Sequence, residues 1–207
     1  MYCSIRGSRM NGGKLYVFEG FDGVGKTTIV RLLDKALNNM YIEHSSYSFP
    51  GKNVSSFGNL VYDMHHNRKK YFDHDINNIS LQLMHIAAHL DILERLIMPD
   101  LSNGKVVLLD RFWWSTFAYG IGNHIDRNTL KHILYPEFRL FEKISISKIF
   151  LIRRNTEELY SLTTDSLIKQ AYEELTAWGD YKDLVESVDN IDIDITLNTI
   201  LSLMGLK

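Results

Sequence analysis

The chain has 207 residues, 45% of them apolar and 23% charged, and a formal net charge of −2. These values predict one globular domain, and a charge near zero gives no reason to expect binding to nucleic acid or to an anionic membrane. No apolar run approaches the ~20 residues that a membrane-spanning helix needs. The single cysteine, Cys3, cannot form an internal disulfide. We therefore expect a cytoplasmic protein that binds neither nucleic acid nor a membrane.

Residues 1–13 lack the apolar stretch of a secretory signal and are expected to form a disordered tail before a single domain over residues 14–207. Apolar periodicity then predicts strands and helices in alternation. The expected strands are Lys14–Glu19, Tyr41–Ser46, Lys105–Asp110, Lys148–Ile152 and Val188–Ile193. The expected helices are Lys26–Asn38, Phe57–Asn67, Ile76–Leu101, Trp114–Gly120, Arg127–Phe138, Thr156–Leu162, Ser166–Trp178 and Ile195–Leu203. Such alternation predicts an α/β fold with a parallel sheet covered on both faces.

A complete phosphate-binding loop, Gly20-x-x-x-x-Gly25-Lys26-Thr27, joins the first strand to the first helix. Its glycines let successive N–H groups turn toward phosphate oxygens, and the new helix adds its positive N-terminal end. Lys26 is expected to reach the β- and γ-phosphates, and the Thr27 hydroxyl to hold Mg²⁺. The predicted ATP-binding residues of the loop are Gly20, Phe21, Asp22, Gly23, Val24, Gly25, Lys26, Thr27 and Thr28.

A second candidate site follows the apolar run at residues 106–109, which ends abruptly in Asp110-Arg111. Ligands of parallel α/β sheets bind at the carboxyl ends of the strands, so this pair should face the phosphate loop. A carboxylate there suits Mg²⁺, and an arginine can clamp a phosphate with two hydrogen bonds. Alternatively, Asp110 caps the next helix and Arg111 pairs with a surface carboxylate. The phosphate loop favours the first interpretation.

Two sequence blocks resemble the thymidylate kinases. Residues 18–28, Phe-Glu-Gly-Phe-Asp-Gly-Val-Gly-Lys-Thr-Thr, are similar to the opening of that family, and residues 110–119 are similar to its Asp-Arg segment. The resemblance implies a P-loop kinase, a three-layer sandwich with a five-stranded parallel sheet and a lid at about residues 160–168. It further implies transfer of the γ-phosphoryl group of ATP to a (deoxy)nucleoside monophosphate, dTMP or a related pyrimidine nucleotide, by a homodimer.

The resemblance also implies roles for single residues. Asp22 matches an acid that contacts the 3′-hydroxyl of the acceptor, and Arg111 matches an arginine that holds the acceptor phosphate. The family's catalytic residues thus correspond to Lys26, Arg111 and Asp22. The residues expected to bind the acceptor are Asp22, Phe49, Lys52, His89, Arg111, Ser115 and Tyr119. For Phe49, Ser115 and Tyr119 the alternative is packing in the core.

The chain departs from the family where the acceptor base is read. Family members carry Phe-x-x-Asn-Arg before the third strand, whereas residues 86–90 here are Ile-Ala-Ala-His-Leu. The missing aromatic and arginine predict loose base selectivity, or a substituted base accommodated by His89, Phe49 or the Trp113-Trp114 pair. His85 and His89 lie four residues apart, a spacing that could ligate a metal, but no third ligand is evident, and pocket or core histidines are favoured.

The charged groups around the transferred phosphate differ as well. The phosphate loop and residues 161–166 contain no arginine, although the family supplies a catalytic arginine from one of these places. Arg153, Arg154 and Lys169 are the nearest substitutes, and Arg153 and Arg154 are assigned to ATP. The run Arg68-Lys69-Lys70 is expected to be a surface turn rather than a nucleic-acid patch.

Three other classes of nucleotide-binding protein fit the sequence less well. A deoxynucleoside kinase would need a base for a sugar hydroxyl, for which Asp22 or Asp110 could serve. A regulatory GTPase would need an Asn/Thr-Lys-x-Asp element, which the sequence lacks. An ATPase motor would need a strand ending in paired acids, and Asp110-Arg111 is not such a pair.

Overall fold

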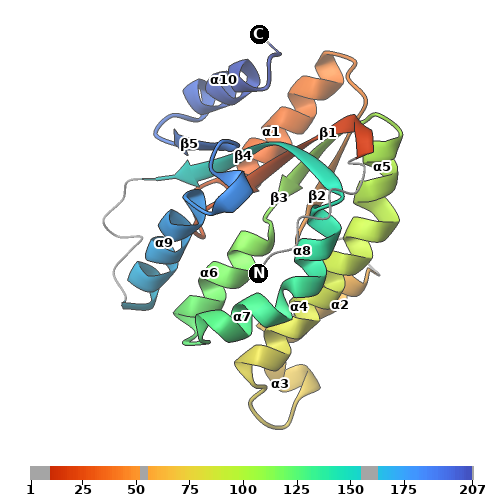
Figure 1. Ribbon diagram of the computed structural model, residues 1–207. Helices are drawn as coiled ribbons and strands as arrows, with labels where there is room; N and C mark the ends of the chain where they lie inside the picture. Colours follow the sequence, from red (N-terminus) through yellow and green to blue (C-terminus); the bar gives the residue numbers. More distant parts are fainter. Residues whose placement is uncertain (1–9, 52–55, 155–162, 207) are drawn as a thin grey trace.

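The computed structural model describes residues 10–51, 56–154 and 163–206 (Figure 1). Five parallel strands form one sheet in the order β2-β3-β1-β4-β5. The strands are β1 (Met10–Glu19), β2 (His44–Ser48), β3 (Val106–Asp110), β4 (Ile144–Arg153) and β5 (Val185–Asp189). In this order β1 and β3 are parallel neighbours, and their carboxyl ends lie side by side. The phosphate loop and Asp110-Arg111, which follow these two strands, therefore meet at the carboxyl end of the sheet.

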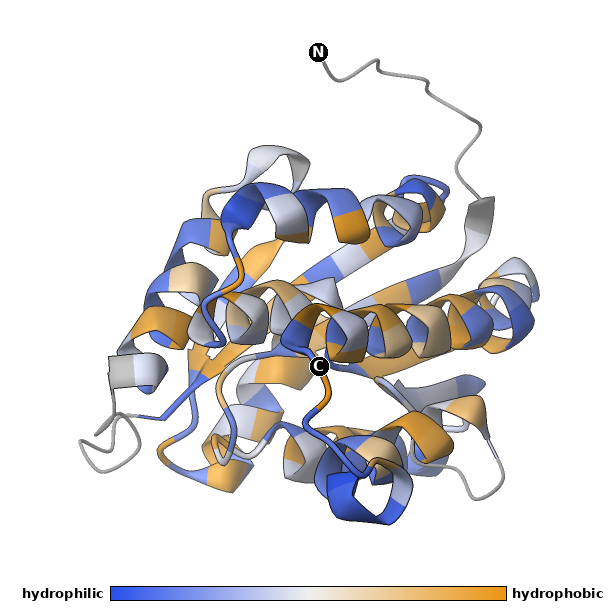
Figure 2. Ribbon diagram, turned by 90° about the horizontal axis from the view of Figure 1, so that it is seen from below, coloured by the Kyte–Doolittle hydropathy of each residue, from blue (hydrophilic) through white to orange (hydrophobic). Residues whose placement is uncertain are grey.

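Helices cover both faces of the sheet, which confirms the predicted three-layer sandwich. Helices α1 (Lys26–Asn39) and α10 (Ile193–Leu203) lie on one face in Figure 1. The other face carries α4 (Asn78–Ile92), α6 (Trp113–Gly122), α8 (Tyr135–Phe141) and α9 (Thr163–Thr176). Most helices show both colours in Figure 2, as expected when one side of a helix is buried.

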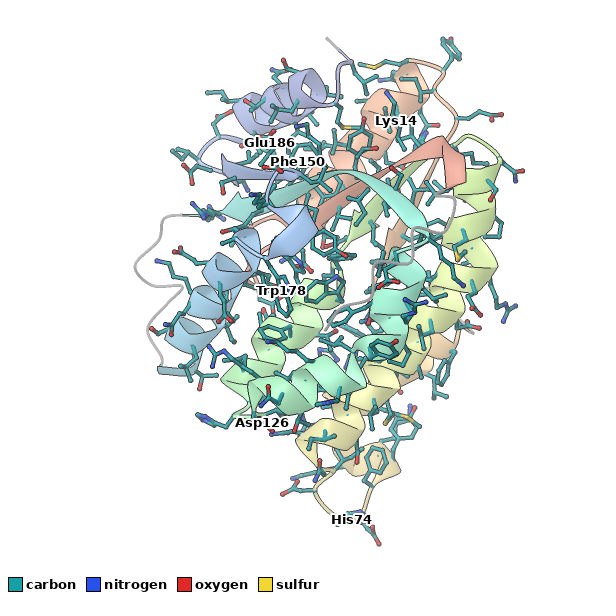
Figure 3. All side chains as sticks on the ribbon, in the orientation of Figure 1. Lys14, His74, Asp126, Phe150, Trp178 and Glu186 are labelled. Atoms are coloured by element: carbon teal, nitrogen blue, oxygen red, sulfur yellow. The ribbon has the colours of Figure 1, made fainter. Side chains whose placement is uncertain are left out.

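The central strand β1 divides the core into two parts. Residues 15–18 are almost completely buried and alternate in direction, so Leu15 and Val17 pack under α4 and α6 whereas Tyr16 and Phe18 pack under α1. Phe18 stacks on Phe150 of β4, which Figure 3 labels, with ring centroids 5.3 Å apart. Burial of β1 on both faces fixes the position of the loop that follows it.

The remaining helices surround this frame. The predicted helix at residues 76–101 is α4, a π-helical segment (Leu93–Ile97) and α5 (Met98–Ser102) in succession. Helix α2 (Phe57–His66) packs on α4, and the basic run forms the short exposed helix α3 (Arg68–Tyr71) instead of a turn. A 3₁₀ turn (Gly179–Tyr181) precedes β5. Within the described ranges, no helix has the length and apolar character needed to cross a membrane.

Several predicted boundaries were wrong. Strand β1 starts at Met10, so residues 10–13 belong to the strand and not to a tail. The helix predicted at residues 127–138 is two helices, α7 (Arg127–Ile133) and α8, because Pro136 has no N–H to donate and favours a new helix start. Strand β5 ends four residues earlier than predicted, since Asp192 caps α10. The predicted helix at residues 156–162 lies outside the described residues, as do residues 160–162 of the expected lid. Residues 163–168 of that lid form the start of helix α9.

Candidate active site

The phosphate loop leads directly into α1, and its backbone requires glycine. Gly25 has φ 99° at the N-cap of α1. A Cβ atom there would lie 2.4 Å from Nδ2 of Asn190, which donates a 2.7 Å hydrogen bond to the Val24 carbonyl. A Cβ on Gly20 would lie 2.3 Å from the Ile152 carbonyl oxygen. Asn190, just beyond β5, therefore braces the loop, and its role was missed because β5 was expected to extend through it.

Lys26 is the first residue of α1 and folds back over the loop. Its Nζ donates 2.7 Å hydrogen bonds to the carbonyls of Gly20 and Phe21, and the residue is only 5% exposed. Burial, together with the positive charge of Arg111, lowers the pKa of Lys26 to about 8. A negatively charged phosphate at this position would favour the protonated amine.

Thr27 and Asp110 come together at the base of the loop. The Thr27 hydroxyl donates a 2.6 Å hydrogen bond to Oδ2 of Asp110, whereas the buried Oδ1 has no hydrogen-bond partner. Hydroxyl and carboxylate oxygens are ligands that Mg²⁺ accepts, so this pair fits a magnesium ion. No group of three or more metal-ligating side chains occurs in the described parts of the chain, and the ion would therefore arrive with the nucleotide phosphates.

Arg111 occupies a strained position at the end of β3. Its φ is 74°, and its N–H donates to the Phe18 carbonyl at 2.9 Å. The guanidinium donates from Nη1 to the Ser115 hydroxyl at 3.1 Å, pairs through Nη2 with the Asp22 carboxylate, and lies 5.7 Å from the Tyr119 ring centroid. The Tyr119 hydroxyl in turn accepts from the Asp22 N–H at 3.1 Å. Burial opposes ionisation of Asp22, but Arg111, Tyr119 and Lys26 together outweigh it and lower the pKa of Asp22.

The carboxylate of Glu19, which sequence reasoning missed, lies beneath this cluster. Glu19 is completely buried and accepts hydrogen bonds from the N–H groups of Phe112 (2.7 Å) and Ser115 (2.9 Å). It also accepts from the hydroxyls of Ser115 (2.8 Å) and Tyr172 (3.1 Å). Burial raises the pKa of Glu19, against the opposing effect of Arg111. The sequence did contain a signal for this role, because Glu19 is the only charged residue in the otherwise apolar run at residues 15–19.

Phe49, one of the expected acceptor residues, directly follows β2. The Phe49 N–H donates to the Asp110 carbonyl at 2.9 Å, and its ring stacks on His89 with centroids 3.9 Å apart. Lys52 lies outside the described residues. Ile86, which aligns with the family's base-stacking aromatic, is buried in the same core cluster as Phe49. His85 bonds with His65 (2.8 Å) rather than forming a metal site with His89.

A cavity of about 310 Å³ opens beside the phosphate loop, between the ends of β4 and β5 and helix α9. Arg153 and Arg154 line it, and Lys169 reaches it from α9. Gly20, Phe21 and Asp189 contribute to the same wall. The structure thus brings together the loop, Asp110, Arg111, Ser115 and Tyr119, with the two cavity arginines beside the loop and His89 stacked on Phe49.

Known proteins resemble the chain in sequence and in fold. The Thymidylate kinase family model matches residues 18–177. A thymidylate kinase of Chlorobium limicola is 35% identical over 159 residues, which cover 73% of this chain and 69% of that protein. One of Leptospira borgpetersenii is 28% identical over 171 residues, 75% of this chain and 78% of the relative.

Solved structures agree with this assignment at the level of the fold. A crystal structure of thymidylate kinase from Ehrlichia chaffeensis has a TM-score of 0.70 at 20% identity, covering 94% of this chain and 99% of that one. The Candida albicans thymidylate kinase also reaches 0.70, at 19% identity, covering 94% and 92%. With the family match over most of its length, the chain belongs to the thymidylate kinase family.

Proposed function

We propose that this protein transfers the γ-phosphoryl group of ATP to dTMP, giving ADP and dTDP. The observation that carries the proposal is Arg111, a cation fixed by Ser115 and Asp22 beside the phosphate loop. A guanidinium held there suits an acceptor that carries a phosphate of its own. The names of the relatives supply the thymidylate acceptor.

Positioning and charge neutralisation account for catalysis by this site. The loop amides and Lys26 would bind the β- and γ-phosphates, while Arg111 would hold the acceptor phosphate in line with the bond that breaks. The acceptor phosphate oxygen is already a nucleophile, so no strong base is required. Thr27 and Asp110 would hold Mg²⁺, which neutralises charge on the β- and γ-phosphates when bound.

The same geometry argues against a deoxynucleoside as the acceptor. A neutral sugar hydroxyl would need a general base near the transferred group. The Asp22 carboxylate is paired with Arg111, and its lowered pKa makes it a poor proton acceptor. Asp22 is better suited to orient Arg111 and to accept a hydrogen bond from the acceptor sugar.

An ADP-release assay tests the proposal directly. The protein should release ADP from ATP and Mg²⁺ with dTMP, and not with thymidine. Activity with thymidine that exceeds activity with dTMP would overturn the proposal, and so would ADP release that is independent of any acceptor.

The proposal also covers the oligomeric state of the protein and its cellular compartment. We infer a cytoplasmic homodimer that binds no nucleic acid, supported by the balanced charge of the chain and by exposed apolar side chains on α2 and α4. These side chains are Phe57, Leu60, Ile79 and Leu83. Light scattering of the purified protein should give a mass of twice 24.0 kDa, and a monomer would contradict the dimer.

A further inference from the structure

Phe21 lies between the cavity beside the phosphate loop and Arg111. It is half-buried and forms part of the wall of the cavity of about 310 Å³. Its ring is stacked on the ring of Tyr119, with centroids 6.3 Å apart and an interplanar angle of 16°. The guanidinium carbon of Arg111 lies 5.7 Å from the centroid of the same Tyr119 ring. A residue of the cavity wall is thus linked to Arg111 through one aromatic side chain.

A second wall residue, Tyr172 on α9, is linked to Arg111 through Ser115. Tyr172 is 3% exposed, and its hydroxyl lies 2.9 Å from the Ser115 hydroxyl and 3.1 Å from Oε2 of Glu19. The Ser115 hydroxyl accepts a 3.1 Å hydrogen bond from Nη1 of Arg111. Burial, together with the charge of Glu19, raises the pKa of Tyr172 well above its usual range, so its hydroxyl keeps its hydrogen near neutral pH. Two residues of the cavity wall therefore support the same guanidinium.

Nucleotide binding acts on the backbone on both sides of Phe21. Nζ of protonated Lys26 carries three hydrogens, and the carbonyls of Gly20 and Phe21 accept two of them at 2.7 Å. Lys26 is expected to bind both the β- and the γ-phosphate, so at least one of these carbonyls must give up its hydrogen bond. Both carbonyls belong to peptide groups that flank Phe21. The binding of phosphate therefore changes the hydrogen bonding of this residue.

The peptide group between Phe21 and Asp22 carries this change toward Arg111. Its carbonyl oxygen accepts from Lys26, and its N–H, which belongs to Asp22, donates to the Tyr119 hydroxyl at 3.1 Å. A peptide group is planar, so a rotation that changes one of these hydrogen bonds also changes the other. The Asp22 carboxylate is itself paired with Arg111. The nucleotide side and the acceptor side of the site therefore share one rigid unit.

We propose that Phe21 and Tyr172 are positioning residues that couple the nucleotide cavity to Arg111, so that a nucleotide and an acceptor monophosphate each bind more tightly when the other is bound. A nucleotide in the cavity contacts both wall residues and fixes these two supports of Arg111 before the acceptor arrives. The second ligand then loses less conformational freedom on binding. The inference rests on the proposed function and deepens it, because it assigns cooperation between the two substrates to named side chains.

Calorimetry with ADP and dTMP measures the coupling without turnover, because ADP has no γ-phosphoryl group to transfer. With Mg²⁺ present, ADP should lower the Kd of dTMP about fivefold or more, and dTMP should lower the Kd of ADP by the same factor. Phe21→Leu keeps an apolar wall but removes the stacked ring, and Tyr172→Phe removes only the hydroxyl. Each should reduce the coupling factor at least about twofold, and the double variant should bring it to about one, while the Kd of either ligand alone changes less than about threefold.

Direct repulsion between the phosphates of the two ligands is present in every variant, so a change in the coupling factor reports on the side chains. Two substitutions of matched chemistry serve as controls. Tyr16→Phe removes a buried tyrosine hydroxyl, which donates to the Met204 carbonyl at 3.4 Å in the core on the opposite face of the sheet. Phe72→Leu replaces a half-buried phenylalanine that follows α3 and is not among the described residues lining the cavity. Both controls should keep the coupling factor of the wild type.

The outcomes separate this proposal from the proposed function. A wild-type coupling factor within about twofold of one overturns the coupling, and so does an unchanged factor in the double variant. If dTMP is phosphorylated in either case, the proposed function still stands. If the coupling is present and is lost in the double variant but no dTDP forms from ATP and dTMP, the proposed function fails and the coupling stands. Absence of dTMP binding, alone and with ADP, overturns both. Should Tyr172→Phe not fold, Phe21→Leu decides alone, because it changes a half-buried residue of a loop.

Discussion

The Ser115 hydroxyl donates a 2.8 Å hydrogen bond to Oε2 of Glu19, and the oxygen of this hydroxyl accepts a 3.1 Å hydrogen bond from Nη1 of Arg111. A single hydroxyl therefore connects a completely buried carboxylate at the end of β1 with the guanidinium that would hold the acceptor phosphate. Tyr172 of α9 joins the same network, 2.9 Å from the Ser115 hydroxyl. The orientation of Arg111 depends on a residue that does not face the acceptor itself.

Glu19→Gln should therefore impair catalysis more than ATP binding. The amide retains one acceptor oxygen but places an NH₂ group where the Ser115 or Tyr172 hydroxyl now donates, so Arg111 loses its fixed support. We expect kcat to fall about 10- to 100-fold with little change in KM for ATP, measured by two-substrate kinetics. Glu186→Gln, which removes a half-buried pairing with Lys148 far from Arg111, is the control and should leave kcat unchanged. Similar effects of both substitutions would contradict the role of Glu19.

Lys26→Ala should abolish phosphoryl transfer without unfolding the protein. Alanine is the best helix former and Lys26 starts α1, and removal of a buried amine relieves the cost of burying its charge. The rate should fall about 10²- to 10³-fold while the circular dichroism spectrum and Tm are retained. A variant that keeps more than about a tenth of the wild-type rate would show that the loop is not catalytic in this way.

ATP binding should take up protons near pH 8. The pKa of Lys26 is about 8 in the protein without nucleotide, so about half of the amines are uncharged at that pH. Phosphate charge raises this pKa and drives protonation. Calorimetry in buffers of different ionisation enthalpy should detect uptake of up to about half a proton per ATP, and ATP affinity should weaken as the pH rises above 8. Proton release, or no exchange in the wild type, would argue against the buried Lys26.

Two substitutions of Arg111 should have the same effect on activity and different effects on stability. Arg111→Ala and Arg111→Gly should each lower kcat/KM for dTMP at least about 10²-fold while changing ATP affinity much less. Glycine tolerates the φ of 74° at this position and alanine does not, so the glycine variant should be about 1 kcal/mol more stable, a Tm difference of roughly 2–4 °C. Equal loss of ATP affinity would place Arg111 on the nucleotide side, and equal Tm values would show that the backbone there is unstrained.

The sequence predicted the parts of this site that are local in the chain. The phosphate loop and Asp110-Arg111 each follow a buried strand, and parallel strands bring such ends together, so the Thr27–Asp110 contact could be expected. Contacts between residues that lie far apart in the sequence could not be predicted in this way. Glu137 lies 48 residues from His89, and Tyr172 lies 153 residues from Glu19. In the sequence Tyr172 has the spacing of a core residue of the helix predicted at residues 166–178, and Glu137 falls near the end of the helix predicted at residues 127–138.

The comparison with the family supplied the chemistry of the phosphate site, whereas the residues that read the base stay a prediction. It directed attention to Ile86 and Leu90, yet Ile86 is in the core and Leu90 packs against it. His89, which directly precedes Leu90 in the helix, stacks its ring on Phe49. One residue of sequence is about 100° of helix rotation, so an assignment offset by one position selects a different face.

The central claim is phosphorylation of the phosphate group of dTMP, and the product itself tests it. ³¹P NMR of a reaction containing ATP, Mg²⁺ and dTMP should show the two coupled signals of dTDP growing together with those of ADP, and Lys26→Ala should remove them. A reaction with thymidine should stay unchanged. Formation of dTMP from thymidine, or loss of ATP without dTDP, would contradict the account.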